Sequence, residues 1–326
     1  MTSNMHLQTG IAILFSVAAS FCAGTFAADA YPTRPIRMIV GFAPGGGTDL
    51  TARPVAAKLS ELLGQQVVVE NRPGAAGNIA TEQVARAAPD GYTILMGTIA
   101  ALAINPSLYG NLKFDTETDF APVIQVVNAT NVLVLHPSVA AGSVQELIAL
   151  AKQKSLSAGS SGIGATGHLA IELFNELAGV KLVHVPYKGG GPAMTDLVGG
   201  QVQLVFATTA SAIPQIRAGR IKGIAVTTAR RSALMPELPT IAEAGLPGFD
   251  ANNWYGIVVP AKTPRAIIDQ LNAEVTKVLN MADVRATLFN QGLDPAPGTP
   301  EQFGAYIRSE RIKWAKVIKA SGAKAE

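Results

Sequence analysis

The chain has 326 residues, of which 48% are hydrophobic and 15% charged, and its net charge at pH 7 is +3. This length suffices for two ordinary domains, and the composition is that of a globular protein. The small net charge, with no run of more than two basic residues, argues against nucleic acid as a partner.

The first 30 residues have the pattern of a secretory signal peptide. Residues 11–26 form an apolar stretch that is short for a membrane span and has the length of a signal-peptide core. Residues 28–30 (ADA) fit a small-residue cleavage site, although no Lys or Arg precedes the apolar stretch. We therefore expect cleavage near Ala30 and a periplasmic protein. Cys22, the only cysteine, lies in this segment, so thiolate chemistry, disulfides and Cys-bound metals are not expected in the mature chain.

Alternating strand-like and helix-like runs predict a first α/β block. Its strands are expected at residues 36–40, 66–70 and 93–96, and its helices at 52–63 and 78–87. Pro54 is tolerated best in a first helical turn, which favours Thr51 as the N-cap of the first helix. The alternation predicts a mainly parallel sheet with crossover helices.

A second α/β block begins near Val126, and a helical tail follows it. Its strands are expected at 131–135, 182–185, 202–207 and 222–227, and its helices at 143–152, 169–177, 193–198 and 211–218. Ser143 and Glu146 form a capping-box pattern at the first of these helices. Beyond a Pro- and Gly-rich stretch, a strand is expected at 254–259 and helices at 264–279, 284–291 and 300–320. We expect the tail to pack on the first block, with a cleft between two lobes.

Two glycine-rich turns, residues 41–49 (GFAPGGGTD) and 157–168 (SAGSSGIGATGH), each connect a strand-like run to a helix-like run. Backbone N–H groups at a helix start are free to bind an anion, and the helix dipole favours negative charge there. Two such turns predict two anion-binding loops, one on each lobe.

Nucleotide-binding and catalytic interpretations of these turns are each excluded by a single residue. Gly47 occupies the position of the P-loop lysine, and no acidic residue follows Val185, where a dinucleotide site requires one. Ser161 lacks the glycine that a nucleophile elbow would place two positions later. The histidines of the mature chain, His136, His168 and His184, do not have metal-ligand spacing. The sequence thus predicts no cofactor, no metal and no catalytic residue.

Two polar residues of the turns leave alternatives open. His168 opens the second helix and either lines the cleft or holds the turn. Asp49 either caps the first helix or contacts an ammonium group or an ordered water in the cleft. His184, in a predicted strand, is expected to be packed or cleft-lining. A secreted enzyme using Asp49, His168 or His184 stays a less favoured hypothesis.

Five motifs in order carry a family resemblance: residues 42–49 (FAPGGGTD), 69–77 (VENRPGAAG), 89–93 (PDGYT), 185–189 (VPYKG) and 239–249 (PTIAEAGLPGF). Over essentially all of the mature chain, the sequence resembles the Bug family, the periplasmic solute-binding proteins of tripartite tricarboxylate transport systems. The resemblance implies an α/β fold of the two-lobed type II periplasmic binding protein kind, or Venus flytrap. Each lobe would hold a mainly parallel sheet flanked by helices. The lobes would comprise residues 31–127 with 253–326, and residues 128–252.

The resemblance also implies a ligand and partners. The ligand would be a small carboxylate (a di- or tricarboxylate, an acidic amino acid or an aromatic acid) held by backbone amides of both loops, often through water. The protein would be a monomer that delivers it to the membrane subunits of a tripartite transporter, or signals to a sensor protein, without catalysis. The candidate ligand-binding residues are Ala43, Pro44, Gly45, Gly46, Gly47, Thr48, Asp49, Thr98, Ser160, Ser161, Gly162, Gly164, Thr166, His168, Tyr187, Lys188, Thr208 and Asn253.

Overall fold

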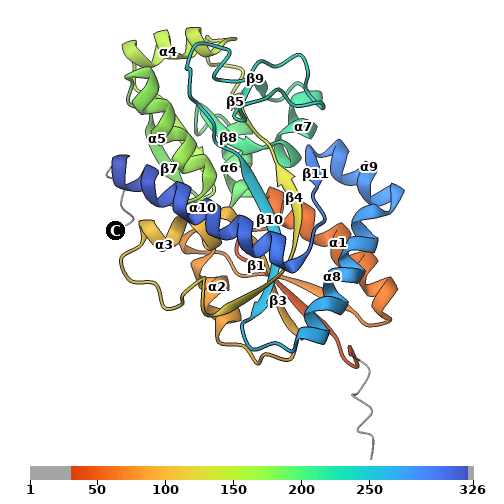
Figure 1. Ribbon diagram of the computed structural model, residues 1–326. Helices are drawn as coiled ribbons and strands as arrows, with labels where there is room; N and C mark the ends of the chain where they lie inside the picture. Colours follow the sequence, from red (N-terminus) through yellow and green to blue (C-terminus); the bar gives the residue numbers. More distant parts are fainter. Residues whose placement is uncertain (1–30, 322–326) are drawn as a thin grey trace, which may run out of the picture. The chain divides into compact units, whose positions relative to one another are not determined.

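The computed structural model describes residues 31–321, which form two mixed β-sheets flanked by helices (Figure 1). The first sheet has six strands in the order β11-β4-β10-β3-β1-β2, and the second has five in the order β7-β6-β8-β5-β9. This arrangement is the α/β fold class that the sequence predicts, but both sheets are mixed rather than mainly parallel. The predicted signal peptide, residues 1–30, lies outside the described residues. Within residues 31–321, no helix combines the length and the apolar character needed to cross a bilayer.

The first sheet joins a parallel half to an antiparallel half. Strand β1 pairs in parallel with β2 and β3, whereas β10 is antiparallel to β3 and β4, and β11 is antiparallel to β4. Its strands are β1 (Ile36–Val40), β2 (Val67–Asn71), β3 (Thr93–Thr98), β4 (Phe120–Ala129), β10 (Asn253–Pro260) and β11 (Leu293–Pro295). Its helical segments are α1 (Gly47–Leu63), η1 (Ala75–Gly77), α2 (Asn78–Ala85), η2 (Ala100–Ile104), α3 (Asn105–Leu108), α8 (Arg265–Asn280), α9 (Ala282–Asn290) and α10 (Pro300–Ser321).

The second sheet is parallel except around β5. Strands β6, β7 and β8 are parallel, and β5 is antiparallel to both β8 and β9. Its strands are β5 (Asn131–Leu135), β6 (Ser157–Ser160), β7 (Val183–Pro186), β8 (Leu204–Thr208) and β9 (Lys222–Val226). Its helices are α4 (Val144–Gln153), α5 (Thr166–Ala178), α6 (Gly190–Val198) and α7 (Thr209–Arg217).

The chain passes between the sheets twice. Strand β4 ends at Ala129 and β5 begins at Asn131, so Thr130 alone separates strands of different sheets; the return runs between β9 and β10. Because β10 re-enters the first sheet from the second, it lies antiparallel to its neighbours, and this makes the sheet mixed. The predicted lobe limits, at 127/128 and 252/253, remain a prediction.

Each sheet buries its own aromatic core. Trp254 of β10 packs edge-on against Phe303 of α10, with ring centroids 5.5 Å apart. Gly256 is required beneath this pair, because a Cβ there would overlap the Phe303 ring. In the second sheet Phe206 lies between Phe174 and Phe249, at centroid distances of 5.9 and 6.3 Å. Burying each of these large side chains stabilises the fold by about 1.5–3 kcal/mol.

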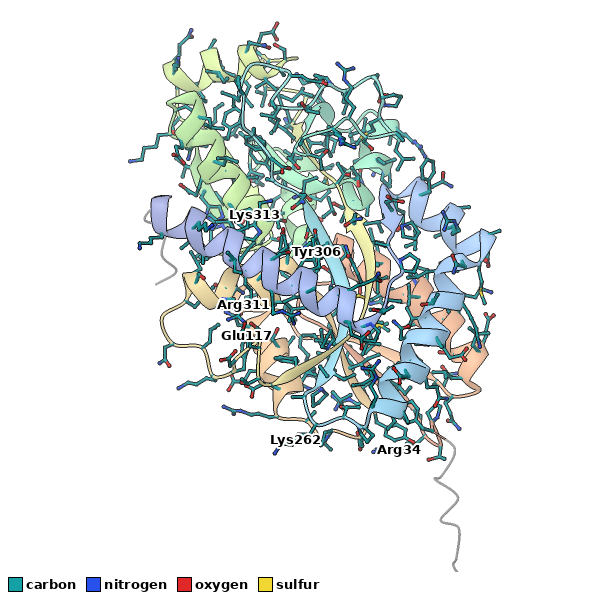
Figure 2. The ribbon with its side chains drawn as sticks, viewed as in Figure 1. Arg34, Glu117, Lys262, Tyr306, Arg311 and Lys313 are labelled. Atoms are coloured by element: carbon teal, nitrogen blue, oxygen red, sulfur yellow. The ribbon has the colours of Figure 1, made fainter. Side chains whose placement is uncertain are left out.

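Helix α10 packs on the first sheet, as the sequence predicts for the tail. It contacts η2, α3 and β4. Arg311 of this helix pairs with Glu117 at 3.1 Å (Figure 2). Lys313 approaches Asp250 at 3.9 Å. The second pair ties α10 to the segment by which the chain returns from the second sheet.

Several helices begin earlier than predicted, and two of these starts lie in the glycine turns. Helix α1 begins at Gly47 rather than near Ala52, which places Pro54 inside the helix. The glycine turn itself supplies the first helical turn, because Asp49 accepts a hydrogen bond from Gly45 N and closes the turn. Helix α5 likewise begins at Thr166, within the second glycine turn. At α4 the predicted cap is confirmed, since Ser143 accepts a hydrogen bond from Glu146 N.

Strands β4 and β6 were not expected. Residues 157–160 (SAGS) have no β-branched or aromatic side chain, so the sequence favoured a turn there, yet their burial in the second sheet makes them a strand. Strand β4 carries Pro122, Gln125 and Asn128, which weaken a strand pattern. Tertiary pairing overrides local preference in both cases.

Candidate functional site

A cavity of ≈ 280 Å³ lies where the loops after β1, β2, β6 and β7 meet. These loops follow the carboxyl ends of their strands, the usual ligand position in open α/β sheets. The cavity is lined by Gly41, Phe42, Gly74, Ala75, Ala76, Tyr109, Ser161, Gly162, Ile163, Pro186, Tyr187 and Lys188. Elements of both sheets therefore contribute walls, and Lys188 is the charged side chain among these lining residues.

The loop after β2 has a left-handed backbone. Gly74, Ala75, Ala76 and Gly77 have φ values of +141°, +46°, +49° and +93°. A non-glycine residue in this region carries about 1–3 kcal/mol of strain, and such strain concentrates at functional sites. Among the described residues, the N–H groups of Ala75 and Ala76 have no hydrogen-bond acceptor. Successive free N–H groups in a turn form a concave site suited to an anion.

Replacing Ala76 with Gly is expected to stabilise the fold by about 0.5–1 kcal/mol, because glycine adopts the left-handed region without strain. Ala57, exposed in the middle of α1, provides the matched control: Ala57→Gly should destabilise by about 0.5–1 kcal/mol. Urea unfolding of both variants measures the two free energies. A loss of stability at Ala76 as large as that at Ala57 would show that the loop is unstrained.

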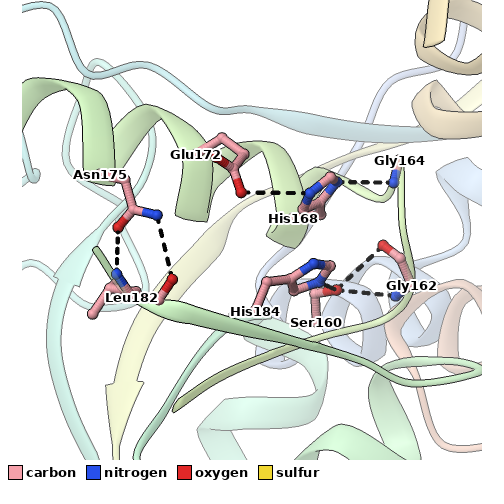
Figure 3. A network of polar contacts seen from close by, with 8 residues as sticks. All are labelled: Ser160, Gly162, Gly164, His168, Glu172, Asn175, Leu182 and His184. Atoms are coloured by element: carbon pink, nitrogen blue, oxygen red, sulfur yellow. Dashed lines mark hydrogen bonds and ion pairs between the residues drawn. The ribbon is translucent and has the colours of Figure 1, made fainter. Parts of the chain in front are cut away.

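The loop after β6 uses its amides internally (Figure 3). Gly162 N donates to Ser160 Oγ at 3.1 Å, and Gly164 N donates to His168 Nδ1 at 3.1 Å. The sequence predicted that this turn presents free amides, and for these two glycines that expectation is wrong. Their hydrogen bonds instead fix the shape of the loop, which brings Ser161, Gly162 and Ile163 to the cavity wall.

Two stacked histidines support this loop. The rings of His168 and His184 lie 4.2 Å apart at 16°, and His184 Nε2 is 2.6 Å from Ser160 Oγ. Burial lowers the pKa of both His168 and His184 to about 4, and His168 further lowers the pKa of His184. Both rings are therefore neutral at pH 7. For His168 the hydrogen bond from Gly164 N also requires this, because Nδ1 must be unprotonated to accept it. Of the two alternatives for His168, the structure supports the one in which it holds the turn.

The Ser160–His184 contact has the short distance of a nucleophile–base pair, yet Ser160 is fully buried. Its Oγ also accepts from Gly162 N and donates to Gly162 O at 3.2 Å. A substrate carbonyl has no access to this oxygen. The pair anchors the loop.

Asp49 closes the first glycine turn. It is 2% exposed and accepts hydrogen bonds from Gly45 N at 3.0 Å, Arg53 Nε at 2.9 Å and Asn71 Nδ2 at 2.9 Å. Burial acts to raise the pKa of Asp49, but hydrogen bonds from Arg53, Gly45 and Asn71 lower it overall. Asp49 therefore stays ionised and closes the glycine turn from within the first turn of α1. The N-cap of this helix is Gly46 and carries no side-chain cap, so the predicted capping of the helix by Asp49 is wrong.

The first glycine turn contacts the loop after β7 through backbone alone. Ala43 N donates to Lys188 O at 3.0 Å. A Cβ on Gly46 would lie 3.2 Å from Gly190 N, and a Cβ on Gly191 would overlap the carbonyl oxygen of Pro44. Glycines on both sides thus allow the backbones to touch, and this contact lies beside the cavity.

Several predicted residues gather around Tyr255 instead of the cavity. A Cβ on Gly47 would lie 2.6 Å from Thr208 Oγ1 and 2.7 Å from the Tyr255 hydroxyl. Asn253 Nδ2 donates to that hydroxyl at 3.1 Å, and Thr98 is the strand partner of Tyr255. Burial raises the pKa of Tyr255, which stays protonated.

The predicted residues therefore separate into groups. Ser161, Gly162, Tyr187 and Lys188 line the cavity, whereas Ser160, Gly164, Thr166 and His168 lie in or behind its second-sheet loop. Pro44 and Gly45 face a separate groove with α6 and α7. Ligand contact by each of the predicted residues stays a prediction. The lining residues absent from the candidate list are Gly41, Phe42, Gly74, Ala75, Ala76, Tyr109, Ile163 and Pro186. Of these, Gly41, Phe42 and Ile163 lie within the two predicted anion-binding loops.

One sequence pattern could have identified some of these additional cavity residues. Residues 71–77 (NRPGAAG) form a third glycine-containing turn between a strand and a helix. It carries three of the missed residues, Gly74, Ala75 and Ala76. Tyr109 follows a helix, and no local pattern marks it.

Comparison with known proteins places the chain in a family. The model of the "Tripartite tricarboxylate transporter family receptor" matches residues 51–323. The chain is 38% identical over 311 residues to Protein BugT of Bordetella pertussis, covering 94% of this chain and 95% of that protein.

Solved structures agree with this match. An R. palustris protein with adipate is 40% identical with a TM-score of 0.88, covering 90% of this chain and 99% of that one. MatC from Rhodopseudomonas palustris with bound malate is 31% identical with a TM-score of 0.85, covering 88% and 100%. The chain belongs to the tripartite tricarboxylate transporter family of receptors.

Proposed function

We propose that this protein is a periplasmic solute-binding receptor that captures a small carboxylate in the cavity between its two sheets. It is exported with cleavage near Ala30, acts as a monomer without catalysis, and delivers its ligand to a tripartite tricarboxylate-type transporter. The observation that carries the proposal is the left-handed loop, whose residues Ala75 and Ala76 line the cavity and have unpaired N–H groups. The family match, and relatives solved with adipate and malate, support a carboxylate as the ligand.

Backbone amides suit reversible capture. Hydrogen bonds from N–H groups to a carboxylate contribute about 1.5–3 kcal/mol each, and they strengthen when water is excluded. Lys188 adds a positive charge to the same cavity. A few such bonds give useful affinity and still allow release at the membrane.

A thermal-shift screen tests the proposal. Protein freed of copurified ligand by unfolding and refolding is mixed with di- and tricarboxylates, amino acids and aromatic acids. Because a ligand that binds the folded state raises the melting temperature, at least one carboxylate should raise it by several degrees. If no carboxylate in the panel does so, the receptor function is wrong.

A negative charge introduced at Ala75 tests whether the carboxylate binds at the left-handed loop. Ala75 is exposed at the cavity with φ +46°, a conformation that Asp and Asn tolerate. Ala75→Asp should weaken carboxylate binding at least about a hundredfold, since like charges about 4 Å apart repel by several kcal/mol near a protein surface. Ala75→Asn, of the same shape without the charge, should bind far more tightly than Ala75→Asp. Equal affinities for the two variants by titration calorimetry would place the ligand elsewhere.

A further inference from the structure

A short helical segment after β3 forms a firm support beside the cavity. Segment η2 is a π-helix whose five residues are all buried, and α3 and Tyr109 follow it directly. A π-helix is rare and is frequent at functional sites. Helix α10 packs on both η2 and α3. Residues 105–109, which comprise α3 and Tyr109, are called the brace below; they are fixed to the first sheet and contact loops of both sheets.

The brace holds the left-handed loop after β2. Asn105 is fully buried, and its Nδ2 donates to Asn78 Oδ1 at 2.7 Å and to Ala76 O at 3.3 Å. Both partners are acceptors, so they define which side of the Asn105 amide is the nitrogen. The bond to Ala76 O ties a residue with left-handed backbone to α3. It thereby fixes the backbone that carries the unpaired N–H group of Ala76.

The brace also supports the loop after β6. The Tyr109 hydroxyl donates to Ile163 O at 2.8 Å. A Cβ on Gly164 would lie 2.5 Å from Asn105 Oδ1 and 3.3 Å from the Tyr109 ring. Glycine at position 164, where φ is +88°, therefore lets this loop of the second sheet rest directly on the brace.

The two supported loops approach each other at the cavity. A Cβ on Gly162 would lie 3.8 Å from Ala76 N, so the loop after β6 passes beside one of the unpaired N–H groups. Gly162, Ile163 and Ala76 all line the cavity, as does Tyr109. A continuous set of contacts thus runs from Ile163 through the brace to Ala76.

We infer that Asn105 and Tyr109 are positioning residues for ligand binding, and that the brace couples the loop after β6 to the left-handed loop. The inference rests on the proposed carboxylate function and deepens it, because it assigns two residues that orient the N–H donors of Ala75 and Ala76. A ligand on the left-handed loop is held more tightly while the bond from Tyr109 to Ile163 is intact, although that bond lies on another loop.

Tyr109→Phe tests the coupling, because it removes the bond to Ile163 O and keeps the ring. With adipate and malate as probes, calorimetry on ligand-free mature protein should show roughly 3- to 10-fold weaker binding. At saturating ligand, amide hydrogen exchange of residues 74–77 should be faster by a similar factor. Tyr92→Phe is the control, since its hydroxyl bonds Thr33 N at 2.9 Å outside the cavity lining. Unchanged affinity and exchange in Tyr109→Phe would overturn the inference and leave the receptor function standing.

A double-mutant cycle separates positioning from direct ligand contact by the Tyr109 hydroxyl. Gly164→Ala forces the loop off the brace, so adding Tyr109→Phe to it should weaken binding by less than about twofold more. Gly179→Ala provides the matched background, with φ at +60° and no described atom within 4 Å of the added Cβ. There Tyr109→Phe should keep its full effect. Full effects in both backgrounds would show that the hydroxyl acts on the ligand directly, and would overturn the inference.

The role of Asn105 has its own matched pair. Asn105→Ala should weaken binding of the same probes about tenfold, because Ala76 O loses its donor. Asn78→Ala loses the same bond between Asn78 and Asn105 but keeps the bond to Ala76 O, and it should bind within about threefold of the wild type. Equal affinities for the two variants would overturn the role of Asn105. If Asn105→Ala does not fold, the cycle at Tyr109 and Gly164 decides.

Failure of the proposed function gives a different result. If the wild type binds neither adipate nor malate, the acid that gives the largest shift in the thermal screen replaces them as the probe. If no acid in that screen binds the wild type, the proposed function fails and this inference fails with it.

Discussion

Gly191→Ala is expected to weaken ligand binding by about 10- to 100-fold. A Cβ at this position would overlap the carbonyl oxygen of Pro44, so the loops after β1 and β7 could no longer touch. Overpacking of this kind costs about 1–3 kcal/mol. If ligand binding requires the contact, the same amount is lost from the binding free energy. Titration calorimetry measures the affinity.

Gly199→Ala is the matched control, because it lies at the other end of α6. Its φ is −78°, and a Cβ there would come no closer than 3.4 Å to its neighbours. This variant should bind like the wild-type protein. Small-angle scattering of the liganded forms gives an independent measure, since Gly191→Ala should stay more extended at saturating ligand. Wild-type affinity in Gly191→Ala would show that the backbone contact is not part of the bound state.

Acid is expected to destabilise the protein between pH 6.5 and pH 4, through His168 and His184. Burial lowers the pKa of both rings to about 4 in the folded state from an ordinary value of 6.5. The unfolded chain therefore binds more protons in this range, so the stability is complete above pH 6.5 and falls as the pH drops toward 4. A shift of this size corresponds to roughly 3 kcal/mol for one histidine. The two contributions are not additive, because the rings are stacked.

The variant His168→Asn tests how much of the acid-dependent loss of stability comes from protonation of His168. An Asn side chain can keep an acceptor near the place of Nδ1, so the bond from Gly164 N is retained without a titrating group. Urea unfolding at pH 7, 6, 5 and 4.5 should show a shallower loss in this variant than in the wild type. Identical slopes for wild type and His168→Asn would refute the assignment. Burial also raises the pKa of Glu172, which opposes part of the loss.

The architecture could be predicted from the sequence because apolar runs mark the strands and a capping box marks a helix start. Strands β1 and β5 begin and end where their apolar runs do, and the capping box places the start of α4. The start of α1 was missed because the first helical turn consists of Gly47, Thr48 and Asp49, which have no apolar periodicity. Strand β6 was missed because Ser, Ala and Gly become a strand only through burial between β7 and β8.

The candidate site was predicted only in part, for a different reason. Glycine turns indicate where N–H groups are free in an isolated loop, but side chains in the first turn of the following helix, four residues along, decide which stay free. His168 satisfies Gly164 N, and Asp49 satisfies Gly45 N. At Ala75 and Ala76 the left-handed backbone leaves the N–H groups unpaired, and an alanine in a sequence does not reveal its φ angle.

The backbone contact between Ala43 and Lys188 has a kinetic consequence. Ala43 does not line the cavity, yet its bond to Lys188 O must break before the loops after β1 and β7 can separate. If the proposed ligand leaves when these loops separate, its dissociation rate depends on a hydrogen bond whose donor, Ala43 N, lies outside the cavity lining. A substitution that breaks this contact is then expected to shorten the residence time of the proposed ligand.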